Sequence, residues 1–185
     1  MNKRRVVITG LGIVSPVGNN VNDAWANIIN GVSGIAPITN IDTEIQAVKF
    51  GGAVKEFDVS QYLSPKEAKK MDIFIHYGMA AGIQAFEDSG IEVTDENAER
   101  IGVAIGAGIG GLTTIEKTAD LFREKGPKRI SPFFVPSSII NMVSGNMSIK
   151  FGLKGPNFAI VTACTTGTHN IGDASRIIEY GDADV

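Results

Sequence analysis

The chain has 185 residues, of which 43% are hydrophobic and 20% are charged, so it can fold as one domain around a sizeable core. Its formal net charge of −3 argues against a general nucleic-acid-binding protein. No apolar stretch is long enough to span a bilayer, and the single cysteine excludes an intrachain disulfide and a cysteine-based metal cluster. These properties predict a cytoplasmic α/β protein without a metal centre.

The first expected element is a strand over residues 5–9, because this run is apolar and β-branched and so suits a strand buried on both faces. A helix capped by Asn22 should follow and end at Gly31. The apolar face of that helix would consist of Trp25, Ile28 and Ile29. A short strand-like patch occupies residues 47–54.

The clearest helix covers residues 71–86, where apolar residues follow the i, i+3, i+4 spacing of one helical face. Gly78 and Gly82 fall inside this apolar stripe. A glycine has no side chain to hold a neighbour away, so these two positions predict another element packed very close to the helix.

Strands and helices continue to alternate in the rest of the chain. Buried strands are expected over residues 101–105 and 158–162, and a further strand should begin at residues 183–185. Helices are expected before Gly126, from Pro136 onward, and over residues 167–178. This order predicts a layered α/β domain with a mostly parallel sheet.

Two glycine-rich stretches resemble nucleotide-binding motifs. Residues 106–111 fit G-x-G-x-x-G after a strand, and residues 10–15 nearly do. A dinucleotide site also needs an acidic residue about 20 positions further on, at a strand end. Residues 28–38 contain no acid, and Asp120 lies in a helical pattern. Tight turns therefore explain both stretches better, and an NAD(P)-dependent reductase stands as the alternative function.

Cys164 lies where an apolar strand ends and a helical pattern begins. Such an elbow places the middle side chain at a helix N-terminus, where the helix dipole and free amides favour a reactive thiolate. Ala163 and Gly167 leave room for a sharp turn and for a substrate. Lone cysteines are more often inert buried thiols, so the position alone leaves both interpretations open.

The segment FAIVTACTTGTHNIGDASRIIEYGDADV resembles the active-site elbow of the β-ketoacyl-acyl carrier protein synthases, and HNIG is typical of their type II members. The stretches RVVITGLGIVSPVGN, KEAKKMD, GAGIGGL and GPKRISPFFVPSSIINM match the same family in order and spacing. The resemblance implies a thiolase-like fold of two similar halves, each with a mostly parallel five-stranded sheet between helices. Residues 1–185 would form the N-terminal half, which carries the nucleophile, and the C-terminal half would lie outside this chain.

The resemblance also implies the chemistry of fatty acid elongation. Cys164 would take the acyl group from acyl carrier protein, and malonyl-acyl carrier protein would then condense with it after losing carbon dioxide. No cofactor is expected, because phosphopantetheine is carried by the acyl carrier protein. The family takes two catalytic histidines from its second half. Neither His76 nor His169 matches them, so both are assigned structural roles and the 185-residue chain alone is expected to be inactive.

Weaker parts of the resemblance concern the acyl pocket and the partners. Ile109 matches the position that narrows the pocket, and Phe134 matches the dimer-interface region at its far end, although both suit plain core residues. A homodimer is therefore expected, with acyl carrier protein as partner and neither nucleic acid nor membrane. The basic residues that match the carrier-docking surface are Lys66, Lys69, Lys70, Lys128 and Arg129. A solvated charged face is the alternative.

Overall fold

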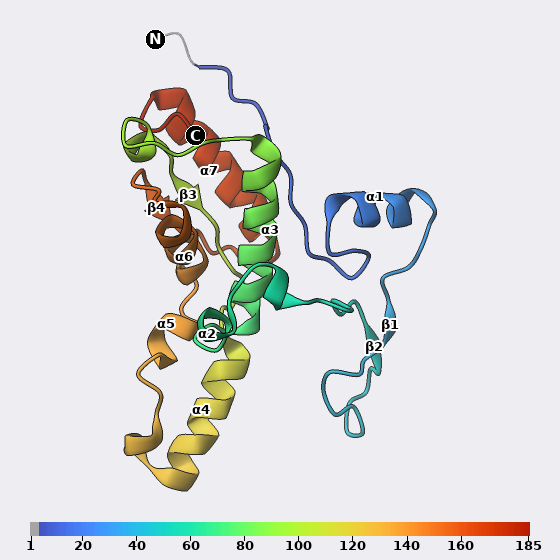
Figure 1. Cartoon of the computed structure of the whole chain (residues 1–185). Coiled ribbons are helices and arrows are strands. Elements are labelled where there is room, and N and C mark those ends of the chain that lie inside the picture. Colours follow the sequence, from blue (N-terminus) through green and yellow to red (C-terminus); the bar gives the residue numbers. More distant parts are fainter. Residues whose placement is uncertain (1–3) are drawn as a thin grey trace.

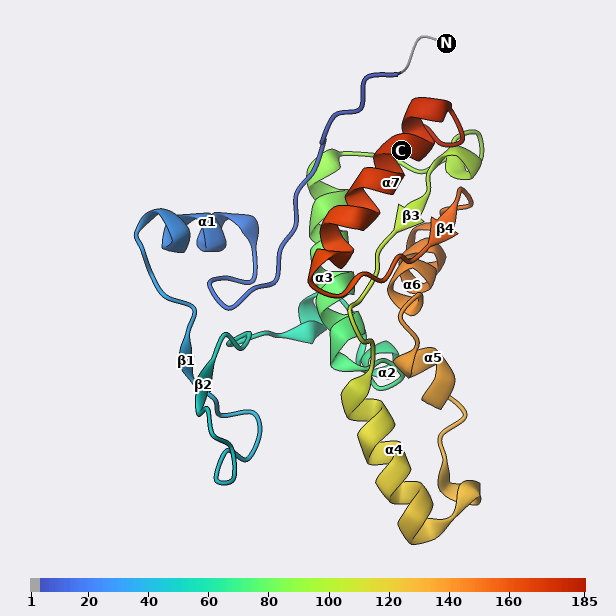
Figure 2. The same cartoon turned by 180° about the vertical axis from the view of Figure 1, so that it is seen from behind.

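The computed structural model describes residues 4–185, whose helices form an elongated body with a smaller excursion at one side (Figure 1, Figure 2). The helices are α1 Val21–Ile29, α2 Pro65–Ala68, α3 Ile73–Ser89, α4 Leu112–Lys125, α5 Phe134–Ser138, α6 Met142–Phe151 and α7 Thr166–Tyr180. The strands are β1 Ala36–Pro37, β2 Phe50–Gly51, β3 Val103–Ala104 and β4 Asn157–Phe158. The 3-10 turns are η1 Val59–Gln61, η2 Ala98–Arg100, η3 Pro127–Arg129 and η4 Ala163–Thr165.

The core forms where α3 packs against α6. Ile75, Met79 and Ile83 of α3 are buried together with Val143 and Met147 of α6. The two glycines of α3 face this contact, as the sequence predicted. A Cβ atom added to Gly78 would lie 2.6 Å from Val143 Cγ1, and one added to Gly82 would lie 3.0 Å from Met147 Sδ.

The parallel pair β3–β4 lies between helices, because α6 and α7 both pack against β3 (Figure 2). Ser144 of α6 is fully buried, and its hydroxyl accepts from Ile105 N at 2.9 Å and lies 2.9 Å from Phe158 O, to which it can donate. This hydroxyl links the residue that follows β3 to the last residue of β4. Parallel pairing is thus confirmed over two residues of each strand, and residues 4–185 do not by themselves form the five-stranded sheet that the resemblance implied.

The predicted strand over residues 5–9 is wrong. The segment is extended but joins no ladder within the described chain, and Ile8 is 78% exposed. Its continuation is held by side chains of α3, since Leu11 N donates to Asp88 Oδ2 at 2.9 Å and Ile13 N donates to Gln84 Oε1 at 3.2 Å. The backbone therefore bonds to a helix where a strand was expected.

The smaller part at the side of the main body contains α1 and the antiparallel pair β1–β2 (Figure 1). The cap of α1 is Asn20, which accepts from Asp23 N, and not the predicted Asn22. The expected apolar face of α1 is present but uncovered, since Trp25, Ile28 and Ile29 are all more than half exposed. In the described residues only Ala24 of α1 is buried.

The later elements follow the predicted order, but the strands expected over residues 101–105 and 158–162 are present only as Val103–Ala104 and Asn157–Phe158. Two further differences concern the helix expected from Pro136 and the strand expected at residues 183–185. Pro136 lies inside the short α5, and α6 begins separately at Met142, so the single helix expected there is divided. Residues 183–185 run beside Arg100 and Gly102 without forming a strand, with Gly102 N donating to Val185 O at 2.8 Å. Arg100 also holds this end through its guanidinium, which donates to Gly181 O at 2.7 Å.

Candidate active site

Cys164 lies in η4, immediately before α7, and is exposed. The chain leaves β4, continues extended, and turns sharply at Ala163, whose φ of +50° places it in the left-handed region. This conformation costs a residue with a Cβ atom about 1–2 kcal/mol, so the surrounding structure must hold it in place. The elbow predicted from the sequence is therefore present, with the thiol at its turn.

Asn170 holds the elbow from the second turn of α7. It is buried, and its side-chain amide forms a reciprocal pair with the backbone of Ile160, accepting from N at 3.1 Å and donating to O at 3.0 Å. Thr166 adds a second tie, since its Oγ1 accepts from Thr162 N at 3.0 Å. Sequence reasoning missed Asn170. It lies four positions after Thr166, on the same covered face of the helix, and a polar residue in such a place indicates a buried hydrogen bond.

The N-terminus of α7 presents its first-turn amides without a side-chain cap. A 15-residue helix carries a partial positive charge at this end, and that charge stabilises anions close to the first turn. Cys164 precedes this turn by two residues. The arrangement can favour a thiolate at Cys164 and can also stabilise an oxyanion formed on a substrate held there.

The glycine-rich turn over residues 106–111 packs directly against the elbow. A Cβ atom on Gly106 would lie 2.0 Å from Ile160 O, and one on Gly108 would lie 3.6 Å from Ala163 O. The turn therefore brings Ile109 to the neighbourhood of Cys164, and the Ile109 side chain is 71% exposed. The role of Ile109 in an acyl pocket stays a prediction.

The same turn does not offer a nucleotide site. The N-terminus of α4 is occupied by the Asp72 carboxylate, whose Oδ2 accepts from Thr114 N at 2.9 Å. A pyrophosphate would meet a negative charge where the motif requires free amides. Gly10 and Gly12 likewise serve close packing, since Cβ atoms there would lie 2.1 Å from Ala85 O and 2.0 Å from Ala81 O.

Phe134 begins α5 and is half-buried. An apolar cavity of about 310 Å³ lies next to it, but the residue that lines this cavity is its neighbour Phe133. Lys70 closes one side, with its ammonium 4.7 Å from the centroid of the Phe133 ring. The remaining apolar lining includes Met71, Met79, Met142 and Ile149.

The predicted docking residues fall into two groups. Lys66, Lys69 and Lys70 lie in and after α2, close to the start of α4, whereas Lys128 and Arg129 lie in η3 beyond its other end (Figure 1). The 14 residues of α4 correspond to about 21 Å of helix. The structure therefore offers two basic patches and does not bring the five residues into one cluster.

The two histidines have partners of their own. His76 Nε2 lies 2.9 Å from Ala68 O and so ties α3 to α2. His169 Nδ1 lies 3.4 Å from Thr162 Oγ1, and its Nε2 lies 3.5 Å from Asp173 Oδ2. These contacts suit the structural roles predicted for both, and those roles remain predictions.

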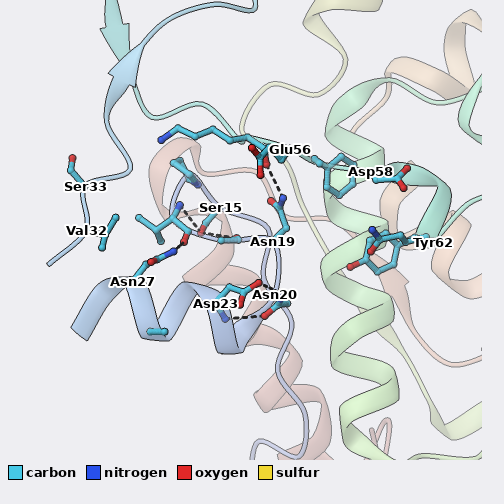
Figure 3. A pocket seen from close by; sticks show the side chains of 17 residues that line it. Ser15, Asn19, Asn20, Asp23, Asn27, Val32, Ser33, Glu56, Asp58 and Tyr62 are labelled. Atoms are coloured by element: carbon cyan, nitrogen blue, oxygen red, sulfur yellow. Dashed lines mark hydrogen bonds between the residues drawn. The ribbon is translucent and has the colours of Figure 1, made fainter. Parts of the chain in front are cut away.

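A polar cavity lies elsewhere, between α1 and the segment that leads into η1 (Figure 3). It has a volume of about 550 Å³ and a polar lining, in which Asn19 Nδ2 donates to Lys55 O at 2.8 Å and Asn27 Nδ2 donates to Val17 O at 2.7 Å. None of the site residues predicted from the sequence lines it. Across residues 4–185, no group of three acidic, histidine or cysteine side chains is arranged to hold a metal ion.

The comparison with known proteins identifies the family. Residues 3–185 match the family described as beta-ketoacyl synthase, N-terminal domain. The chain belongs to this family. The 3-oxoacyl-[acyl-carrier-protein] synthase 2 of Vibrio cholerae is 61% identical over 184 residues, and that of Coxiella burnetii is 53% identical. Each alignment covers 100% of this chain and 44% of the relative, so the chain spans less than half the length of these β-ketoacyl synthases.

Solved structures confirm the thiolase-like α/β fold. The ishigamide ketosynthase/chain length factor superposes with a TM-score of 0.87 at 26% identity, covering 98% of this chain and 45% of that one. A ketosynthase solved in complex with its type II polyketide acyl-carrier protein gives a TM-score of 0.81 at 24% identity, covering 99% and 49%. The comparisons favour a β-ketoacyl synthase over the reductase alternative. Within the described residues, no helix is both long and apolar enough to cross a membrane.

Proposed function

We propose that this chain forms the nucleophile-bearing part of a condensing enzyme of fatty acid biosynthesis. The observation that carries the proposal is the exposed Cys164 at an elbow before the uncapped N-terminus of α7, with the glycine-rich turn packed beside it. The name shared by the relatives, 3-oxoacyl-[acyl-carrier-protein] synthase 2, supports the same reaction. "Complete enzyme" below means this chain joined to the further part that those relatives contain.

In the first half-reaction the Cys164 thiolate attacks the thioester carbonyl of an acyl carrier protein. A bond forms between Sγ and the acyl carbon, and the bond from that carbon to the phosphopantetheine sulfur breaks. The phosphopantetheine leaves as a thiolate, which takes a proton from solvent, and the acyl group is held on the enzyme. The negative oxygen formed on the way is stabilised by backbone N–H groups at the elbow and by the helix dipole. To become nucleophilic, Cys164 needs only a helix N-terminus and local amides, and residues 4–185 contain both.

In the second half-reaction malonyl-acyl carrier protein loses carbon dioxide, and the electron pair released forms a bond from its α-carbon to the acyl carbon. The Cys164 thiolate leaves, and the product is a β-ketoacyl-acyl carrier protein. Decarboxylation needs donors that stabilise the developing negative charge, which the family resemblance assigns to two histidines outside this chain. A polypeptide limited to residues 1–185 should therefore release no carbon dioxide from malonyl-acyl carrier protein.

The central experiment follows Cys164 in the complete enzyme. Incubation with an acyl-acyl carrier protein should add the mass of one acyl group to a peptide containing Cys164, and the thiol-directed inhibitor cerulenin should block that addition. Cys164→Ala should abolish elongation. His76→Gln is a suitable control, since its amide can keep a bond to Ala68 O and elongation should persist. Continued elongation by Cys164→Ala would refute the proposed mechanism.

We further propose that acyl carrier protein docks on the two basic patches. Exposed charges interact over a Debye length of about 8 Å at physiological salt, so each patch would contact a different acidic region of the partner. Reversing Lys69 or Lys128 to Glu should raise KM for carrier-bound substrate and leave a small thioester substrate unaffected. Lys154→Glu reverses the charge of an exposed lysine outside both patches. It should change neither KM for carrier-bound substrate nor the reaction with the small thioester. Equal losses on carrier-bound and small substrates would contradict docking.

The homodimer implied by the resemblance is part of the same proposal, with Phe134 near the contact between the two copies. Light scattering on the complete enzyme should give the mass of two chains at micromolar concentration. A monomer that retains full elongation activity would refute it.

A further inference from the structure

Three helices, α3, α4 and α5, meet at the side chain and backbone of Asp72. This residue caps α3, with its Oδ1 accepting from Phe74 N at 3.3 Å. Its Oδ2 accepts from both Thr114 N at 2.9 Å and Thr114 Oγ1 at 2.6 Å, in the first turn of α4. Its backbone N donates to Ser137 O of α5 at 3.3 Å. One residue thus joins the beginnings of α3 and α4 to α5.

The Asp72 carboxylate is buried, with 6% of the residue exposed, and within residues 4–185 it forms no ion pair. A buried carboxylate without a cation needs its charge balanced by hydrogen-bond donors and dipoles. Here two amides and one hydroxyl point at it, and the N-terminal dipoles of two long helices both favour a negative charge. Removing the charge would therefore loosen both helix starts at once.

The two residues expected to line the acyl pocket depend on this junction. Ile109 precedes Gly110 and Gly111, which lie so close to α5 that Cβ atoms on them would come within 2.7 Å of the Ser138 backbone. Gly111 N also donates to Ser138 O at 2.9 Å. Phe134, at the other end of α5, has its carbonyl bonded by Ser138 Oγ at 2.8 Å. Ile109 and Phe134 are therefore fixed relative to each other through α5.

We propose that Asp72 is a positioning residue that fixes the turn bearing Ile109 against α5, and that it thereby sets the length of acyl chain the enzyme accepts. This inference rests on the proposed condensing function. The Asp72–Thr114 bonds hold the start of α4, which directly follows the turn, and the Asp72–Ser137 bond holds α5. If the carboxylate is lost, the turn gains freedom and Ile109 no longer narrows the pocket to a fixed width.

The test compares two variants of the complete enzyme on hexanoyl- and palmitoyl-acyl carrier protein. Asp72→Asn removes the charge, and Thr114→Val removes one hydroxyl donor while keeping the shape of the side chain. Both should raise kcat/KM for palmitoyl relative to hexanoyl substrate, by roughly threefold to tenfold. The rate at which iodoacetamide modifies Cys164 should change less than the substrate preference does, because Asn170 and Thr166 hold the elbow through hydrogen bonds of their own.

Asp58→Asn is the matched control. The Asp58 carboxylate also accepts from one residue's backbone N and hydroxyl, those of Ser60 at 2.9 and 2.7 Å, but it caps η1 and does not touch the turn. The ratio of kcat/KM for palmitoyl to that for hexanoyl substrate should be the same in Asp58→Asn as in the wild type. The inference would be overturned if kcat/KM fell equally for both substrates. It would also be overturned if folded Asp72→Asn and Thr114→Val kept a palmitoyl-to-hexanoyl ratio of kcat/KM within twofold of the wild type. A wild-type enzyme that takes no acyl group on Cys164 would instead refute the proposed function on which it rests.

Discussion

Replacing Gly78 with alanine should push α6 away from α3 at the centre of the core. The new Cβ would lie 2.6 Å from Val143 Cγ1 and 3.1 Å from Val143 Cγ2, both shorter than carbon atoms tolerate. Val143 is only 2% exposed, and its β-branched side chain has essentially one rotamer available in a helix. The clash must therefore be relieved by movement of the helices.

The size of the effect follows from two opposing contributions. Alanine is favoured over glycine inside a helix by about 1 kcal/mol, whereas overpacking a core costs about 1–3 kcal/mol. We expect Gly78→Ala to lower the free energy of unfolding by about 1 kcal/mol overall. Gly82→Ala faces Met147 Cε and Sδ at 3.0 Å, and this flexible side chain can move away. Gly82→Ala should therefore be neutral or slightly stabilising.

Thermal unfolding of the complete enzyme, followed by circular dichroism, would compare the two variants. A Val143→Ala background provides the internal control, because it removes the two methyl groups that the new Cβ meets. In that background Gly78→Ala should change from destabilising to stabilising. If Gly78→Ala raised the melting temperature in the wild-type background, or matched Gly82→Ala, the close packing of α3 on α6 would be refuted.

Three further changes test the elbow and the C-terminal turn. Asn170→Ala leaves both backbone groups of Ile160 unpaired and should cost about 2–4 kcal/mol of stability in chemical unfolding; an unchanged unfolding midpoint would contradict its role. Ala163→Gly relieves the positive φ, so it should keep or raise stability by about 1 kcal/mol yet slow acylation of Cys164, as mass spectrometry would show. Hydrogen bonding to Arg100 lowers the pKa of Asp184 from its usual 3.8 to about 2. The ionised Asp184 therefore stabilises the folded state above pH 3.8, and this contribution is lost as the pH falls toward 2. Asp184→Asn should therefore lower the melting temperature at neutral pH but not below about pH 2.

The helices were largely predictable because their apolar spacing is local information. The stripe in residues 71–86 located α3, and the glycines within it predicted a close neighbour without saying which one. The beginning of α3 was a residue or two off, since the helix starts at Ile73 after its cap Asp72. A carboxylate immediately before an apolar helix is a standard start signal, and reading it would have corrected the boundary.

The strand at residues 5–9 was not predictable in the same way. An apolar, β-branched run indicates that a segment can pair, but pairing needs a second strand beside it. Here the glycines at positions 10 and 12 bring the backbone onto α3, where Gln84 and Asp88 accept its N–H groups. Such side-chain partners far along the sequence leave no periodic pattern.

The elbow at Cys164 was predicted from the strand-to-helix change, whereas the residues that hold it were not. Asn170 and Asp72 both act through buried polar contacts with backbone distant in the sequence. A hydrophobicity pattern treats such positions as exposed. Their importance becomes visible only when burial and hydrogen-bond partners are known together.

The uncovered face of α1 provides an optical reporter. The sequence contains one tryptophan, and that residue, Trp25, is 62% exposed on α1. Its fluorescence should have the long-wavelength emission of a hydrated indole. Any polypeptide that covers the face formed with Ile28 and Ile29 would move that emission to shorter wavelength, so contact at α1 can be followed in solution without a label.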